Sequence, residues 1–313
     1  MEVPNDPADN GYFQPNPYTD ITERILENLK AEFDSTEGWQ LIGTKNGAVM
    51  EKKTAIDGSA IPVVRGKGTI EGVKPYQFYS IVTHTGARQH WDPRFEAGYA
   101  LKRYSRRAYK FYTIQKGSFL VQPRDFVGVS DTIFEEDGSI YVAQGSVPDD
   151  GETGPVEGRT RGTLHLAGWS IKPKGDGSEI TYIVHVNPNG SIPTAIVASV
   201  VQDTPLSVPN AIDWCQKEGI IPHIEQLDIK STVRIESYSH EDAKKYRLAL
   251  LGKAGDEFDI LVDEEKKYPD GYNVEKIGEG IDYVQLTTSK GKVHAKIGEG
   301  ADGRKFEIII TTK

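Results

Sequence analysis

The feature that most constrains this chain is an uncharged, apolar stretch, Ile192 to Gln202, which follows a Pro188-Asn189-Gly190 turn. A capping Ser191 and Pro193 in the first turn predict that the stretch is a helix. Apolar residues fall on every face of this helix, and such a helix is buried or covers something apolar. Roughly a dozen residues are too few to cross a bilayer, which takes about 20. The stretch therefore predicts a lid over an apolar space or, as the alternative, an ordinary core helix.

The length and net charge of the chain limit the classes of protein to which it can belong. The chain has 313 residues, enough for two domains, and a net charge of -9, which argues against broad nucleic-acid binding. Its single cysteine, Cys215, excludes an intramolecular disulfide and a multi-cysteine metal site. The N-terminal residues have no apolar core, and no window is apolar enough for a transmembrane helix. We therefore expect a cytoplasmic protein.

The order of predicted elements indicates an α+β fold. Residues 1–18 are rich in Pro, Asn and Asp and should form a flexible tail. A helix should begin at Asp20, a good N-cap, and Glu23 three residues later makes the arrangement close to a capping box. Three strands, a helical segment over residues 73–89, six further strands and the lid helix follow, and Pro205 and Pro209 should interrupt that last helix. A long antiparallel sheet must bury its inner face, and the terminal helices are its available partners.

The C-terminal residues have a different texture. Residues 228–313 contain short β runs separated by Gly turns, which predict a small all-β domain, a sandwich, separate from residues 19–222. The last run, residues 306–312, is so apolar that it should be a central or docked strand. Nothing in this part resembles a family that we recognise.

Three motifs, in order, resemble the START family of steroidogenic acute regulatory protein-related lipid transfer domains. They are Arg88-x-x-Trp91-Asp92, Pro123-Arg124-Asp125-Phe126-Val127 and Asn187-Pro-x-Gly190-Ser-Ile-Pro193. The resemblance covers roughly residues 19–218. It implies a helix-grip fold, in which a curved antiparallel sheet wraps around a long C-terminal lid helix. A hydrophobic tunnel between sheet and helix would hold one lipid.

The resemblance also implies which residues contact the ligand. Arg88 and Asp92 lie four residues apart, so their side chains would meet on a helical turn, either to fix the turn or to bind a lipid head group. In choline-binding members an aromatic cage holds the ammonium, and aromatic side chains occupy the matching positions here, although the alternative is that they are core residues. With the apolar residues of the lid and two polar residues discussed below, the predicted ligand-binding set is Arg88, Trp91, Asp92, Phe111, Tyr112, Phe126, Ser130, His165, Trp169, Ile192, Ile196, Val197 and Val200.

A sterol is the alternative cargo. Sterol-binding members place a basic residue where this chain has Ser130, which weakens a direct copy of their polar pocket. The single sterol hydroxyl could instead be met by Ser130, Tyr112, His165 or a water molecule. Arg124 and Asp125 are expected to form a structural pair at the start of a strand.

Two surface features suggest contact with a membrane. Phe119 and Leu120 lie in a predicted loop that would form the tunnel entrance. A basic cluster at a predicted hairpin would either be a solvated turn or touch anionic lipid, and it consists of Lys102, Arg103, Arg106 and Arg107.

No chemistry is indicated beyond binding. The seven histidines show no HxxxH or HxH spacing, so neither a metal site nor a cofactor is expected. We therefore predict a non-enzymatic protein that binds one lipid, favouring a choline-headed phospholipid over a sterol, and that exchanges it at membranes. The alternatives are a lipid-responsive regulatory module that acts through the C-terminal domain on an unknown protein partner and, less favoured, an enzyme on the helix-grip scaffold.

Overall fold

The structure is a computed structural model that describes residues 15–55, 57, 61–117, 121–148, 151, 153–190 and 194–313. Most of the predicted N-terminal tail, residues 1–14, therefore lies outside the described residues. The chain divides into two compact units: Met1–Pro75 with Trp91–Ile212, and Tyr76–His90 with Asp213–Lys313.

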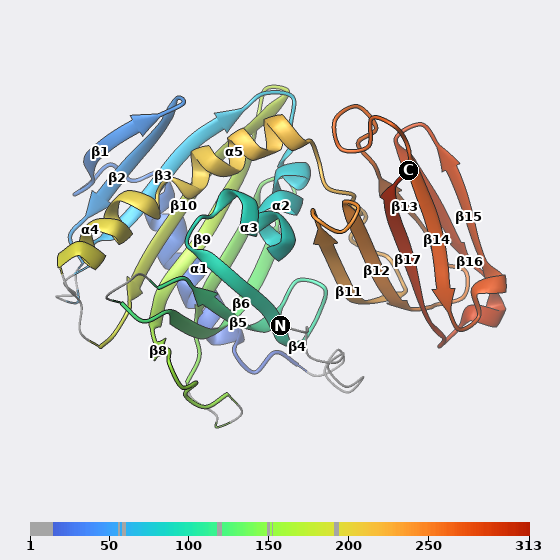
Figure 1. Ribbon diagram of the computed structural model, residues 1–313, viewed down its shortest axis with the longest axis horizontal. Helices are drawn as coiled ribbons and strands as arrows, with labels where there is room; N and C mark the ends of the chain where they lie inside the picture. Colours follow the sequence, from blue (N-terminus) through green and yellow to red (C-terminus); the bar gives the residue numbers. More distant parts are fainter. Residues whose placement is uncertain are drawn as a thin grey trace. The chain divides into compact units, whose positions relative to one another are not determined.

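The first unit is built on a ten-stranded sheet, with strand order β1-β2-β3-β10-β9-β7-β6-β5-β4 and β8 beside β6 (Figure 1). Every pairing is antiparallel except β6 with β8. Together with the helices described below, this is the predicted α+β helix-grip fold. The strands are β1 (Gln40–Lys45), β2 (Ala48–Lys53), β3 (Val63–Ile70), β4 (Phe95–Arg103), β5 (Tyr109–Gln115), β6 (Arg124–Phe134), β7 (Ile140–Ser146), β8 (Thr160–Arg161), β9 (Thr163–Lys174) and β10 (Gly177–Asn187).

Helix α1 (Thr19–Phe33) covers one face of this sheet, which we call the outer face. Its residues Ile25 and Leu29 form a core cluster with Ile183 of β10. The helix begins one residue before the predicted Asp20, with Tyr18 at the N-cap and no side-chain cap, so the predicted capping box is wrong.

Buried Arg65 of β3 fastens the other end of α1. It is 1% exposed, and its Nη1 donates to the carbonyl oxygens of Glu32 (2.5 Å) and Ser35 (2.8 Å). These carbonyls stand at the C-terminal end of the helix, where no intrahelical donor is available. Glu51 neutralises the guanidinium at 2.7 Å, and the ring of Trp39 lies 3.9 Å from it.

The opposite, inner face of the sheet receives the lid. The predicted single helix is two helices, α4 (Thr194–Asp203) and α5 (Ser207–Glu218). Two glycines of β3 let α5 approach closely: a Cβ on Gly66 would lie 2.4 Å from the carbonyl oxygen of Pro205, and one on Gly68 would lie 2.8 Å from Ile212 Cδ1. The first predicted break, at Pro205, is confirmed. The second, at Pro209, is wrong, because this proline sits in the first turn of α5, where the missing N–H costs nothing.

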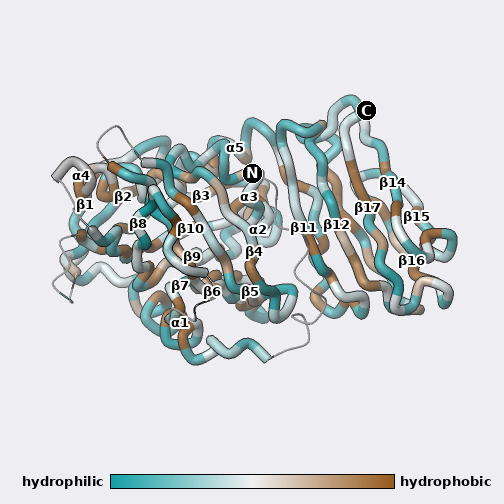
Figure 2. The backbone as a smooth tube through the Cα atoms, turned by 60° about the horizontal axis from the view of Figure 1, so that its bottom comes forward, coloured by the Kyte–Doolittle hydropathy of each residue, from teal (hydrophilic) through white to brown (hydrophobic). Residues whose placement is uncertain are grey.

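The second unit contains helix α2 (Pro75–Thr83) from Tyr76 onward and helix α3 (Thr85–Trp91) up to His90, together with the C-terminal strands. Its strands form a four-stranded sheet, order β11-β12-β17-β14, and a three-stranded sheet, order β13-β16-β15. The last strand, β17, is central, as predicted, and Figure 2 shows hydrophobic stretches along β12 and β17. The strands are β11 (Thr232–Ser239), β12 (Lys245–Leu251), β13 (Glu257–Leu261), β14 (Tyr272–Gly278), β15 (Val284–Ser289), β16 (Lys292–Ile297) and β17 (Lys305–Thr312).

Contacts within the second unit bind α2 and α3 to the C-terminal residues. The ring of Tyr76 stacks on His223 (5.8 Å between centroids), and Gly86 forms a parallel bridge with Ser239. A Cβ on Gly86 would lie 1.8 Å from a backbone oxygen of β11, so only glycine fits there. Residues 76–90 and 213–227 group with the C-terminal strands in this division into units. The division into domains 19–222 and 228–313 stays a prediction.

Candidate functional site

Three of the predicted cage aromatics share the inner face of the sheet. Trp169 and Gly168 are neighbours on β9, so they face opposite sides of the sheet. A Cβ on Gly168 would point at Leu29 of α1, on the outer face, and Trp169 therefore faces the inner side. Register then carries this face across the sheet, from Trp169 through β7 to β6 and β5. On β6 and β5 the same face holds Phe126 and Phe111. All three side chains are at least nine-tenths buried.

Trp169 is the centre of an aromatic cluster. Its ring stacks on Tyr182 of β10, with 4.1 Å between centroids and 19° between planes. The ring of Trp91 forms a T-shaped pair with it, with 6.0 Å between centroids and 88° between planes. One side of the indole is therefore occupied within the protein, so any ligand would have to use the remaining surface.

Two glycines make room for the phenylalanine rings. A Cβ on Gly128, which pairs with Phe111, would fall 2.6 Å from that ring's Cζ. A Cβ on Gly162 would fall 2.3 Å from Cε1 of Phe126. Each ring occupies space that a Cβ at the glycine would need, so both glycines help to set the shape of the inner face.

Tyr112 lies on the outer face, since it is the next residue after Phe111. Its hydroxyl donates to Asp125 Oδ2 at 2.7 Å and accepts from Arg159 Nη1 at 2.9 Å. Burial, followed by the hydrogen bond to Asp125, raises the pKa of Tyr112. The structure therefore separates Tyr112 from the three inner-face aromatics.

Ser130 and His165 also fall in different places. Ser130 is fully buried on the inner face, where its hydroxyl accepts from Gln144 Nε2 at 3.2 Å. His165 stacks on His185 of β10 (4.6 Å), and the register pairs His185 with Leu166, which packs against the α1 core cluster. Ser130 with Gln144 is thus the polar pair on the inner face.

The Arg88-x-x-Trp91-Asp92 motif spans the end of α3. Arg88 is half-buried within the helix, whereas Trp91 and Asp92 are 3% and 7% exposed. Asp92 Oδ1 accepts a hydrogen bond from the backbone N–H of Arg94 at 3.2 Å. The carboxylate therefore shapes the turn that leads from α3 into β4.

Arg124 and Asp125 have separate partners at the start of β6. Arg124 donates to the carbonyl oxygens of Gln122 (2.6 Å) and Pro188 (3.4 Å), and burial lowers its pKa. Asp125 forms a two-point ion pair with Arg161 of β8, at 3.0 Å and 3.2 Å. Both residues anchor this end of the sheet through different contacts, and Arg124 reaches the turn that precedes the lid.

On the lid, the structure describes only some of the predicted side chains. Val200 of α4 is 2% exposed and Val197 is half-buried, whereas Ala198 is exposed. Ile192 and the side chain of Ile196 lie outside the described residues. The described part of α4 therefore has a buried and an exposed side.

Sequence reasoning missed Arg94, which fastens the junction between α4 and α5. Its Nη1 donates to Thr204 Oγ1 at 2.6 Å, and its Nη2 donates to Gln115 Oε1 at 2.7 Å. Thr204 lies between the two helices and Gln115 ends β5. Only the position of Arg94, two residues after the Trp-Asp motif, could have drawn attention to it in the sequence.

The predicted basic cluster lies at the β4–β5 hairpin, and its side chains are half-buried. Lys102 lies over the ring of Tyr104 (5.8 Å), Arg103 over that of Tyr109 (5.3 Å) and Arg107 over that of Phe134 (5.0 Å). Arg106 is in the turn between the strands.

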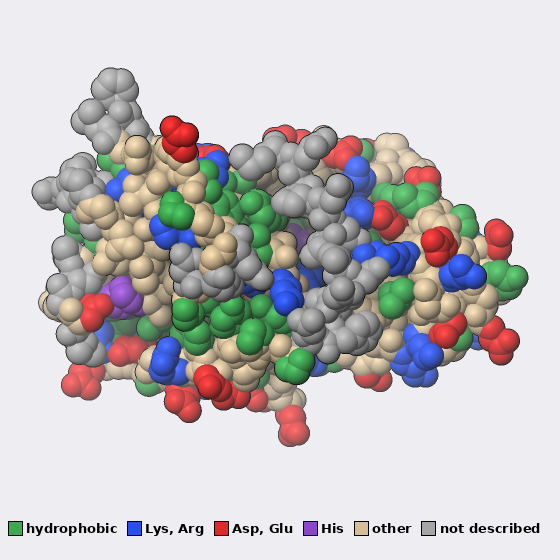
Figure 3. Space-filling view, turned by 90° about the horizontal axis from the view of Figure 1, so that it is seen from below, with side chains coloured by type: hydrophobic (Ala, Val, Ile, Leu, Met, Phe, Trp, Pro, Cys, Tyr) green, Lys and Arg blue, Asp and Glu red, His purple; other side chains and the backbone are tan. Residues whose placement is uncertain are grey.

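Figure 3 shows a gathering of hydrophobic side chains with basic groups on the face seen from below. Phe119 and Leu120 lie outside the described residues.

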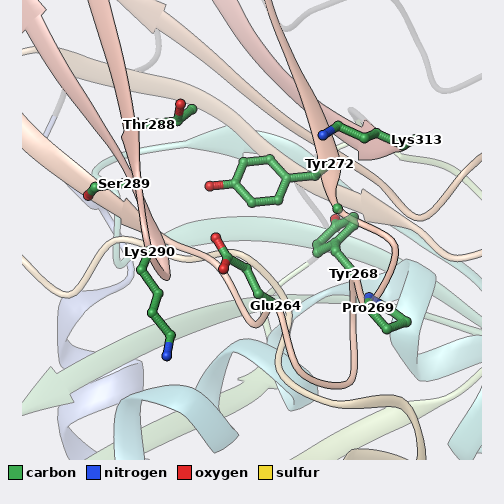
Figure 4. Close-up of a pocket in the computed structure, with 9 residues that line it drawn as sticks. Glu264, Tyr268, Pro269, Tyr272, Thr288, Ser289, Lys290 and Lys313 are labelled. Atoms are coloured by element: carbon green, nitrogen blue, oxygen red, sulfur yellow. The ribbon is translucent and has the colours of Figure 1, made fainter.

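The second unit holds a pocket that the sequence did not predict. It measures about 410 Å³, and Figure 4 shows Tyr268, Tyr272 and Glu264 around it, with Lys290 and Lys313 at its edges. Burial, then the charge of Glu264, raises the pKa of Tyr272. This pocket shares no residue with the predicted ligand-binding set.

A buried lysine also lies in the second unit. Lys267 is fully buried, with its Nζ 4.2 Å from the ring centroid of Trp214 and 5.2 Å from that of Tyr238. Burial lowers its pKa to about 7. The adjacent Cys215 is 1% exposed, and burial raises its pKa to about 12, so this thiol is unreactive.

Among the described residues, no helix combines the length and the apolar character that crossing a bilayer requires. The two lid helices, α4 and α5, have 10 and 12 residues.

Comparison with known proteins places this architecture. The START domain model matches residues 23–210. Human StAR-related lipid transfer protein 5 is similar in fold, with a TM-score of 0.57, 19% identity, and coverage of 63% of this chain and 95% of its own. Human STARD10 is also similar in fold, with a TM-score of 0.56 and 16% identity, and the match covers 67% of this chain and 83% of STARD10. Comparison with curated protein sequences gave no match. The match to the family model covers more than half of the chain, and we conclude that this chain belongs to the START domain family.

Proposed function

We propose that this chain binds and transfers lipid, holding one molecule between the inner face of its sheet and the helices α4 and α5. The observation that carries the proposal is the shared face: Phe111, Phe126 and Trp169 stand on the same side of the sheet as Gly66, against which the lid packs. The fold that this chain shares with a human protein named for lipid transfer supports the same reading.

A carrier of this kind is needed because lipids leave a bilayer slowly. Each Å² of apolar surface exposed to water costs about 25 cal/mol, so a lipid that exposes several hundred Å² faces a large barrier. A cavity replaces the water, and cargo is exchanged when the lid opens at a membrane. Val197 and Val200 of α4 would contact the cargo, together with Ile192 and Ile196.

For the cargo we favour a choline-headed phospholipid, with a sterol second. Aromatic rings attract a desolvated quaternary ammonium by about 2 kcal/mol each, and the inner face carries Phe111, Phe126 and Trp169. Arg88 and Asp92 would meet the phosphate region. A sterol hydroxyl would instead be met by the Ser130–Gln144 pair, whose hydrogen bond of 3.2 Å is long enough to be exchanged for a ligand.

We further propose a cytoplasmic protein that touches membranes only during exchange and performs no catalysis. The basic cluster at the β4–β5 hairpin would meet anionic lipid, with Phe119 and Leu120 at the entrance. We assign lipid binding to residues 19–222 and treat residues 228–313 as an appended domain.

A lipid-responsive regulatory module is the second candidate, and one observation favours it. Helices α2 and α3, which lie within the stretch matched by the START model, pack with the C-terminal strands. Cargo that alters residues 76–90 would therefore be felt in β11, where Gly86 bridges Ser239. Hydrogen exchange measured with and without loaded lipid should show altered protection at residues 232–239 if this candidate is correct, and unchanged protection if it is not.

The proposed function is tested by lipid extraction. Protein is incubated with vesicles of phosphatidylcholine, with or without cholesterol, and re-isolated, and the lipid carried per chain is measured. Val200→Asp places a charge on the buried side of α4 and should abolish loading, whereas Ala198→Asp places the same charge on its exposed side and should leave loading intact. Equal loading of the two variants, with circular dichroism confirming that both are folded, would contradict the proposal.

A further inference from the structure

Two histidines and an aspartate converge at one end of the sheet, although they are far apart in the sequence. His165 belongs to β9, His185 to β10, and Asp57 to the connection between β2 and β3. Their ligand atoms all lie within 4.8 Å of one another. His165 Nε2 is 3.7 Å from Asp57 Oδ2, and His185 Nε2 is 3.6 Å from Asp57 Oδ1.

These separations do not fit ordinary hydrogen bonds. A nitrogen that donates to a carboxylate lies at about 2.7–2.9 Å, nearly 1 Å closer than either pair here. They do fit a shared cation, because two ligands of a tetrahedral zinc ion, each at about 2.0–2.2 Å from the metal, stand roughly 3.3–3.5 Å apart. The two nitrogen–carboxylate separations, 3.7 Å and 3.6 Å, are within a few tenths of an ångström of that spacing.

His185 supplies an independent sign of a missing ligand. The residue is 8% exposed, and its Nε2 is a buried atom with no hydrogen-bond partner. Buried polar atoms are almost always paired, since an unpaired one has lost its hydrogen bonds to water without replacement. This nitrogen points toward Asp57 and His165, where a cation would satisfy it.

The stacking of the two imidazole rings suits a shared ion. The rings of His165 and His185 stack at 4.6 Å and 30°, so their Nε2 atoms reach the same side of the pair. Asp57 supplies a negative charge that compensates a divalent ion.

We propose that Asp57, His165 and His185 form a zinc site with a fourth, open position for water. The site lies on the outer face of the sheet, because His185 is two residues after Ile183 on β10 and so shares its face, and Ile183 packs against α1. It is therefore separate from the inner-face aromatics and does not depend on the proposed lipid binding. A bound ion would fasten the β2–β3 connection to the end of β10, from which the chain runs into the lid.

The test uses the full chain, without affinity-tag histidines, stripped with a chelator and titrated with Zn²⁺ and with Co²⁺. We expect one ion per chain, a four-coordinate Co²⁺ absorption spectrum, and a melting temperature that rises with Zn²⁺. His165→Gln, His185→Gln and Asp57→Asn should each weaken binding by at least ~10-fold, because each removes one of three ligands.

The matched control is His294→Gln. His294 is another partly exposed histidine, 2.8 Å from Asp259 and 3.8 Å from Glu257, and its replacement should leave zinc affinity unchanged. No saturable binding to the wild type, or equal affinity in the wild type, His165→Gln and Asp57→Asn proteins, would overturn the proposal. The last two variants change partly exposed side chains, so they keep the test decisive even if His185→Gln fails to fold.

Discussion

Thr204→Val should make the lid open more often. This change removes the hydroxyl that accepts from Arg94 Nη1 at 2.6 Å and keeps the side-chain shape. Because the bond joins the α4–α5 junction to the turn before β4, an opened lid must break it. The variant therefore removes a contact that only the closed state makes.

The expected increase in lid opening follows from the strength of the hydrogen bond between Arg94 and Thr204. A hydrogen bond from a charged donor contributes about 1.5–3 kcal/mol when buried, and the half-buried position of Arg94 reduces this to about 1 kcal/mol. A loss of about 1 kcal/mol raises the open fraction roughly fivefold. Transfer of a fluorescent phosphatidylcholine between donor and acceptor vesicles should accelerate by up to the same factor if opening limits exchange.

Gln115→Met provides the matched control. It removes the second acceptor of Arg94, at 2.7 Å, but leaves the bond to the lid intact. Its transfer rate should stay close to that of the wild type. A slower Thr204→Val protein with unchanged thermal stability, or an equal acceleration in both variants, would refute the argument that this bond holds the lid.

Three further changes test other parts of the structure. Gly66→Ala places a methyl group against the Pro205 carbonyl and should cost about 1–3 kcal/mol in urea unfolding, whereas Gly154→Ala meets nothing within 4 Å and should be neutral; equal effects would show that α5 does not pack on β3. Trp169→Leu keeps apolar volume but removes a ring, so binding of choline lipid should fall by up to ~30-fold and that of sterol much less; equal losses would remove the cage. Lys267→Met should raise the melting temperature, and the gain should grow as pH falls from 10 to 7. The reason is that Lys267 has a pKa of about 7 in the folded chain and 10.5 in its ordinary state, so protonation at pH below 10 favours the unfolded chain. A gain that does not change with pH would mean that Lys267 stays charged in the folded chain.

Local signals predicted most of the first unit. The proline at 205 marked the break between α4 and α5, and alternating β runs with Gly turns marked the strands of the sheet. The exception at Pro209 is instructive, since a proline that breaks a helix interior is tolerated in a first turn. Strand β14 gives a weaker signal, because it lies at the edge of its sheet and carries half-buried and exposed residues, so its sequence has no apolar run.

The site depended on long-range register, which local patterns do not contain. Phe111 and Tyr112 are neighbours in the sequence, yet they face opposite sides of the sheet, and only strand pairing tells which faces the lid. His165 and His185 meet because β9 and β10 form an antiparallel hairpin with an irregular register at His185, so their spacing of twenty residues resembles no metal motif. Similarly, nothing in the sequence of α2 and α3 indicated that they pack with the C-terminal strands.

The most direct measurement of the central claim is a native mass spectrum of the protein purified from its own host, followed by identification of the extracted lipid. A chain that encloses one lipid should appear as a 1:1 complex whose added mass matches a single lipid, and the Val200→Asp protein should appear without it. A folded wild-type protein that carries no lipid, even after exposure to host membranes, would contradict the account.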